Sequence, residues 1–98
     1  MPSILKSLKL LAEPTRIRLL ALLSREPLSV AELQEILGMG QSRISTQLAQ
    51  LKKEDLVSNH RSGKNSIYSC EAPPEVLEIA NKAVREIAEA EHDFESLD

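Results

Sequence analysis

Two short helix-forming segments joined by a glycine turn, at residues 29–54, constrain the fold of this chain more than any other feature. The first segment opens with SVAE, a capping box in which the Ser29 hydroxyl can accept from the backbone N–H of Glu32 and the Glu32 carboxylate can reach back. Apolar residues follow at helical spacing until Gly38, a residue suited to ending a helix. The sequence therefore predicts a short helix that ends in a tight turn over residues 38–40.

A second helix is predicted directly after this turn, in QSRISTQLAQLKKED. Ile44, Leu48 and Leu51 recur at steps of four and three, which places them on one buried face. The other side chains of its first two turns are polar. Two short helices, a glycine turn and a polar second helix are typical of a helix-turn-helix.

A two-stranded β-hairpin, or wing, is predicted for residues 56–70. Strand-like runs at 56–60 and 66–70 flank the turn SGKN, in which Gly63 and Asn65 tolerate the positive φ of tight hairpins. Apolar spacing also predicts helices over residues 4–12, from Pro14 towards Pro27, and over about 74–93. The predicted fold class is a mainly α (α+β) winged helix-turn-helix, with about five helices and a two-stranded wing in one domain over residues 1–98.

The charge of the chain is unevenly distributed. Residues 1–72 carry ten Lys or Arg against seven Asp or Glu, whereas residues 73–98 carry two against eight, so the net charge of −3 hides a positive front part. Only Tyr68 and Phe94 are aromatic, which argues against a stacking platform for single-stranded nucleic acid. The front of the chain can therefore present a positive face to a polyanion.

The polar face of the second helix is the candidate surface for reading double-stranded DNA, because the first turns of such a helix reach base edges in the major groove. A solvated helix face is the alternative for these residues. The cations of the wing suit phosphate contacts, with an ordinary solvated hairpin as the alternative. The candidate residues are Gln41, Ser42, Arg43, Ser45, Thr46 and Gln47 on the helix and Arg61 and Lys64 on the wing.

Three stretches together, LAEPTRIRLLALL, SVAELQEILGMGQSRISTQL and the GK of the wing, resemble the ArsR/SmtB family of small dimeric repressors over about residues 4–70. The resemblance implies a winged-helix homodimer that is joined by its first and last helices and releases DNA when an effector binds. Gly40 and Gln47 stand where the family often has Ser and His, so the preferred operator can differ.

A homodimer interface is also expected from the apolar residues of the first and last helices, since the last helix is apolar over roughly half its circumference. One small wing cannot cover so wide a face. The candidate interface residues are Ile4, Leu8, Leu11, Ile79, Ala83 and Ile87.

No metal or other cofactor is predicted, and the residues identify no effector. The thiolate pair of metal-sensing relatives would fall at Ser29 and Ala31, which cannot supply the sulfur that soft metals require. A second family site on the last helix would need ligands at Ile79 and Asn81, and only its other half is present, as His92 and Glu95.

No catalytic constellation is found, so the chain is not expected to be an enzyme. The leading hypothesis is a DNA-binding transcriptional regulator, a homodimeric repressor with an inverted-repeat operator. One alternative is the DNA-binding front of a longer enzyme, such as a methyltransferase fusion, and another is a protein-interaction module. A cytoplasmic location is expected, with no membrane partner, since there is no signal peptide and the single Cys70 suits a packing role in a reducing compartment.

Overall fold

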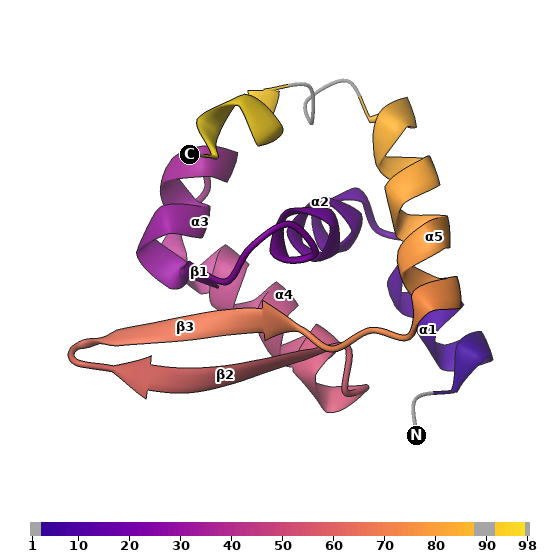
Figure 1. Ribbon diagram of the computed structural model, residues 1–98, viewed down its shortest axis with the longest axis horizontal. Helices are drawn as coiled ribbons and strands as arrows, with labels where there is room; N and C mark the ends of the chain where they lie inside the picture. The colour runs from indigo at the N-terminus through magenta and orange to yellow at the C-terminus, as the bar shows by residue number, and fades with distance from the viewer. Residues whose placement is uncertain (1–2, 88–91, 98) are drawn as a thin grey trace.

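The computed structural model describes residues 3–87 and 92–97. Five α-helices and a small antiparallel sheet follow one another there in the order expected of a winged helix-turn-helix (Figure 1). The elements are α1 (Ile4–Leu10), α2 (Pro14–Leu23), β1 (Leu28–Ser29), α3 (Val30–Leu37), α4 (Gln41–Lys53), β2 (Val57–Ser62), β3 (Asn65–Cys70), α5 (Pro74–Ala83) and the 3₁₀ turns η1 (Val84–Glu86) and η3 (Phe94–Ser96).

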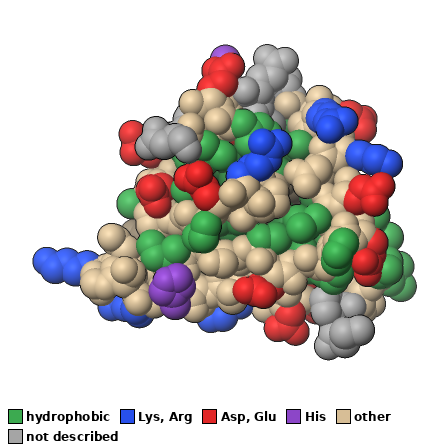
Figure 2. Space-filling model, in the orientation of Figure 1, with side chains coloured by type: hydrophobic (Ala, Val, Ile, Leu, Met, Phe, Trp, Pro, Cys, Tyr) green, Lys and Arg blue, Asp and Glu red, His purple; other side chains and the backbone are tan. Residues whose placement is uncertain are grey.

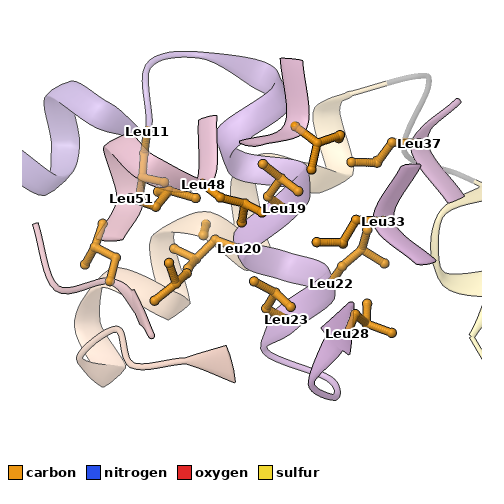
Figure 3. Close-up of a cluster of buried hydrophobic side chains, with 14 of the residues drawn as sticks. Leu11, Leu19, Leu20, Leu22, Leu23, Leu28, Leu33, Leu37, Leu48 and Leu51 are labelled. Atoms are coloured by element: carbon orange, nitrogen blue, oxygen red, sulfur yellow. The ribbon is translucent and has the colours of Figure 1, made fainter. Parts of the chain in front are cut away.

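Helix α2 lies at the centre, and the other elements surround it (Figure 1). Its residues from Arg18 to Leu23 are all buried, as is typical of a helix that is covered on every side. Leucines from α1, α2, β1, α3 and α4 meet in one core (Figure 3). This shared core holds α3 and α4 in place relative to α2.

The sheet has three strands in the order β1-β3-β2, one more than predicted. Strands β2 and β3 form the predicted wing, in which Ser62 pairs with Asn65 across a loop of Gly63 and Lys64. Gly63 takes the positive φ of 63° that this tight loop requires. The extra strand, β1, pairs Leu28 and Ser29 with Tyr68 and Ile67, and it ties the base of the wing to the start of α3.

The last helix is shorter than the predicted range of 74–93. Helix α5 ends at Ala83, a 3₁₀ turn follows, and Ile87 has an extended backbone with φ −100° and ψ 110°. Residues 88–91 of the predicted helix lie outside the described residues. The chain turns because Asp93 bonds to Arg18 of α2 and Phe94 packs against the core; a straight helix would carry both side chains away from α2.

Helix α1 leaves most of its predicted interface stripe exposed, and only Leu11 departs from that prediction. It buries the small side chain of Ser7, with Leu11 just beyond its end, and leaves Ile4, Leu5 and Leu8 exposed. Leu11, predicted at the dimer interface, belongs instead to the core of the protein itself, with 5% of its surface exposed. The described residues of the chain therefore cover the apolar stripe of α1 only in part.

Candidate nucleic-acid interface

The turn between α3 and α4 has the geometry that the sequence predicts. The Ser29 hydroxyl accepts from the backbone N–H of Glu32 at 3.1 Å, and the Glu32 carboxylate accepts from the N–H of Ser29 at 2.8 Å. Gly38 ends α3 with a φ of 65°, in the left-handed region that favours glycine. Gly40 then caps α4 without a side-chain hydrogen bond. These local contacts fix α4 relative to α3.

Helix α4 separates an apolar face from a polar one. Ile44, Leu48 and Leu51 are fully buried in the core. On the opposite side Ser42 and Thr46 are exposed. Of the other predicted base-reading residues, Gln41 and Arg43 are exposed and Ser45 and Gln47 are half-buried.

Two of the predicted base-reading side chains are bound to α2. Arg16 donates from Nε to the side-chain oxygen of Gln47 at 2.7 Å and from Nη1 to the backbone oxygen of Leu10 at 3.3 Å. Arg43 donates to the hydroxyl of Thr15 at 3.3 Å. Bidentate pairing with adenine uses both the oxygen and the nitrogen of a Gln amide, and the bond to Arg16 occupies one lone pair of the Gln47 oxygen and fixes the direction in which this side chain points.

Gln41 lies on the other flank of α4, where the wing meets the helix-turn-helix. It lines a cleft of about 270 Å³ together with Gln34 of α3 and Arg61 and Lys64 of the wing. The structure thus brings the start of the predicted reading helix and both predicted wing cations to one surface. We call this the wing cleft.

Arg61 and Lys64 are exposed near the tip of the β2–β3 hairpin. Cationic side chains gather at this tip and along the adjacent edge of the molecule (Figure 2). Within the part of the chain that the structure describes, neither forms an ion pair. Two exposed cations on a projecting loop that form no ion pair with the described residues suit contact with phosphate groups.

Four large apolar side chains are exposed where α1 lies beside α5, and we call them the apolar patch (Figures 1 and 2). The exposed fractions are 52% for Ile4, 65% for Leu5, 41% for Leu8 and 41% for Ile79. Leu5 was not among the predicted interface residues. Of the remaining candidates, Ala83 is half-buried and Ile87 packs against the small cluster of Ala21 and Val84.

His92 and Glu95, the two residues that match half of the family's second metal site, are exposed near the C-terminal end. Nδ1 of His92 lies 3.3 Å from a carboxylate oxygen of Glu95. Among residues 3–87 and 92–97, no group of three His, Cys, Asp or Glu is close enough to hold a metal ion. Nor does any helix in these ranges have the length and apolar character to cross a membrane.

Cys70, at the end of β3, is half-buried and packs against the core. Burial raises the pKa of its thiol, and a backbone hydrogen bond from Ala72 offsets the effect only in part. Because the thiolate is the reactive form, we expect iodoacetamide to alkylate Cys70 several times more slowly in the folded protein than in urea at pH 7. The rate in the folded protein should climb as the pH rises past the ordinary thiol value. Equal rates in the two states, followed by mass spectrometry, would contradict this assignment.

The sequence is similar to those of known bacterial regulatory proteins. Residues 13–59 match the model of a family described as bacterial regulatory protein, arsR family. The chain is 41% identical over 63 residues to the transcriptional regulator NmtR of Mycobacterium tuberculosis, a match that covers 64% of the chain and 52% of NmtR. It is 39% identical over 82 residues to the regulator Rv0081 of the same organism, covering 81% of the chain and 72% of Rv0081. The chain thus spans about half to three quarters of these relatives.

Solved structures show the same architecture. The transcriptional repressor BigR of Xylella fastidiosa superposes with a TM-score of 0.75 at 27% identity, covering 87% of this chain and 86% of that one. HlyU of Vibrio cholerae gives a TM-score of 0.74 at 29% identity, covering 85% and 89%. The predicted winged helix-turn-helix is therefore confirmed, and NmtR, Rv0081 and BigR are regulators rather than enzymes.

Proposed function

Because the chain belongs to the arsR family of bacterial regulatory proteins, we propose that it is a homodimeric transcriptional repressor that binds an inverted-repeat operator in double-stranded DNA. The observation that carries this proposal is the wing cleft, where Gln41 at the start of α4 meets Arg61 and Lys64 of the wing. A helix start that reads bases and a cationic loop that contacts phosphates must face the same duplex. A repressor of chromosomal genes works in the cytoplasm, which is the compartment we propose.

Base reading is assigned to the side chains of α4 that point away from the core. Ser42 and Thr46 are exposed on the face opposite Ile44 and Leu48. Gln41 lies on the flank towards the wing, and Ser45 follows it one helical turn later. Hydroxyl and amide groups can exchange hydrogen bonds with base edges in the major groove. Gln47 has a positioning role in this proposal, since its oxygen links α4 to Arg16 of α2.

Dimerisation is assigned to the apolar patch. Its four side chains lie on two neighbouring helices, and each leaves 41% or more of its surface exposed. Self-association about a two-fold axis brings the same patch of both copies together. The two copies of α4 then lie in opposite directions on the duplex, and the preferred DNA site acquires the same symmetry.

Selection from a random pool of double-stranded DNA tests this function and identifies the operator in one experiment. We expect an inverted repeat whose half-site centres lie about 10 or 20 base pairs apart, one or two helical turns. Footprinting of the selected site measures the spacing. Enrichment of an asymmetric single half-site would rule out the dimeric arrangement, and absence of any enrichment would rule out sequence-specific DNA binding.

A further inference from the structure

A second cationic cleft lies where α1, α2 and α4 meet, and we call it the α1–α4 cleft. It encloses about 270 Å³. Lys6 and Lys9 of α1, Arg16 of α2 and Lys53 of α4 line it, together with the single carboxylate of Glu54. No residue that lines the wing cleft lines this one, so the two clefts are distinct.

The four cations of the α1–α4 cleft are not neutralised by their surroundings. Throughout residues 3–87 and 92–97, none of them forms an ion pair, although Glu54 lies in the same cleft. The dipole of α4 favours Lys53 in its last turn, but Arg16 stands in the first turn of α2, where a helix dipole disfavours a cation. Helix dipoles alone therefore do not account for this group of charges.

Arg16 is held in place by contacts from two other elements. Its hydrogen bonds to the Gln47 side chain of α4 and to the Leu10 carbonyl at the end of α1 cross-link all three helices at the cleft. A guanidinium fixed by neutral acceptors keeps its full charge. The cleft thus presents a pre-organised positive site with a net formal charge of three.

The cleft and the wing flank α4 on opposite sides. Gln50 lines the α1–α4 cleft and Gln47 bonds to Arg16 of that cleft, whereas Gln41 lines the wing cleft. Helix α1 also carries Ile4, Leu5 and Leu8 of the apolar patch on its other exposed side. In a dimer formed through that patch, the α1–α4 cleft lies near the two-fold axis and the wing lies far from it.

We propose that the α1–α4 cleft binds backbone phosphates at the inner end of each half-site, while the wing binds those at the outer end. This inference rests on the proposed dimeric repressor and adds the central part of the operator to its contact surface. Each lysine that meets a phosphate releases counterions from the duplex, which makes the binding steeply dependent on salt. The inner phosphates then set affinity and register and carry no sequence information.

The test compares Lys6→Gln/Lys9→Gln with the wild type on the selected operator at several salt concentrations. Both lysines are exposed, and circular dichroism melting verifies that the variant folds. We expect affinity to fall about 30-fold at 0.15 M salt and the slope of log K against log salt to flatten by about two, since each phosphate contact contributes about 0.9. The matched control is Lys82→Gln, which should bind like the wild type. Lys82 is also exposed, and it pairs with Glu78 on α5.

Neutral methylphosphonates placed singly along the operator locate the contact. Those near the centre should weaken the wild type but not the double variant, whereas those at the outer ends should weaken both proteins. Lys64→Gln should give the reverse pattern. If the double variant keeps the wild-type salt slope, as expected if the cleft holds only a free anion such as inorganic phosphate, the inference is overturned while the proposed repressor stands. The same holds if the double variant loses its sensitivity to methylphosphonates only at the outer ends of the operator. A wild type that binds no DNA would overturn the proposed function and this inference together.

Discussion

Ile79→Asp is expected to convert the protein into a monomer that no longer binds its operator. Ile79 is 41% exposed on α5, beside the exposed Ile4, Leu5 and Leu8 of α1, so the substitution leaves the core of each copy intact. Fully burying such a side chain is worth about 1.5–3 kcal/mol, and two-fold symmetry places the substitution twice in one interface. Burying two carboxylates without partners there costs several kcal/mol more. Analytical ultracentrifugation at micromolar concentration measures the outcome.

A substitution at the neighbouring residue of α5 serves as the control for Ile79→Asp. Glu78 directly precedes Ile79, is 69% exposed and is not part of the apolar patch, so Glu78→Gln should remain dimeric and bind DNA like the wild type. Ile87 is a poor probe of the interface, because it packs against Ala21 and Val84 within its own chain. A wild type that is already monomeric at micromolar concentration, or a dimeric Ile79→Asp, would contradict the assignment of the apolar patch.

Features set by residues close together in the sequence could be predicted. The capping box at Ser29, the left-handed end of α3 at Gly38 and the two-residue loop at Gly63 each depend on a few neighbouring side chains. The same holds for the buried spacing of Ile44, Leu48 and Leu51. Since these local signals define the helix-turn-helix and the wing, they were sufficient for the fold class.

Features set by distant contacts were missed. Strand β1 has only two residues, and it becomes a strand because Ile67 and Tyr68 of β3 offer it hydrogen bonds. Leu11, predicted at the dimer interface, joins the core of its own chain, and Ser7 is the side chain of α1 that is fully buried. Neither outcome can be derived from hydrophobic periodicity, which shows that a segment is amphipathic but not which neighbour covers it.

In the candidate site, too, local features could be predicted and distant contacts could not. The polar face of α4 and the wing cations follow from spacing and composition, but the bond between Arg16 and Gln47 joins residues 31 positions apart. A sequence signal for Arg16 does exist, since a cation in the first turn of a helix opposes the helix dipole and calls for an explanation. Lys6 and Lys9 gave no such signal, because solvated lysines on a short helix are common.

The turn at the end of α5 depends on a buried ion pair between residues 75 positions apart. Arg18 of α2 donates two hydrogen bonds of 3.0 Å to the two carboxylate oxygens of Asp93. Their side chains are only 10% and 2% exposed. Next to this pair, the guanidinium of Arg25 lies 4.4 Å from the ring centre of Phe94. These contacts, and not local helix propensity, hold residues 92–97 against the body of the protein.

Arg18→Met is expected to destabilise the fold by about 3–5 kcal/mol, because it leaves the buried Asp93 carboxylate without its counter-charge. That is a large part of the 5–15 kcal/mol typical of a small domain, so the midpoint of urea unfolding should drop sharply. Arg18→Met/Asp93→Leu should recover much of the loss, since an apolar pair removes the buried charge altogether. Arg85→Met, on the exposed side of η1, is the matched control and should stay within about 0.5 kcal/mol of the wild type. If Arg18→Met unfolds at the wild-type urea concentration, the ion pair does not hold the C-terminal segment in place.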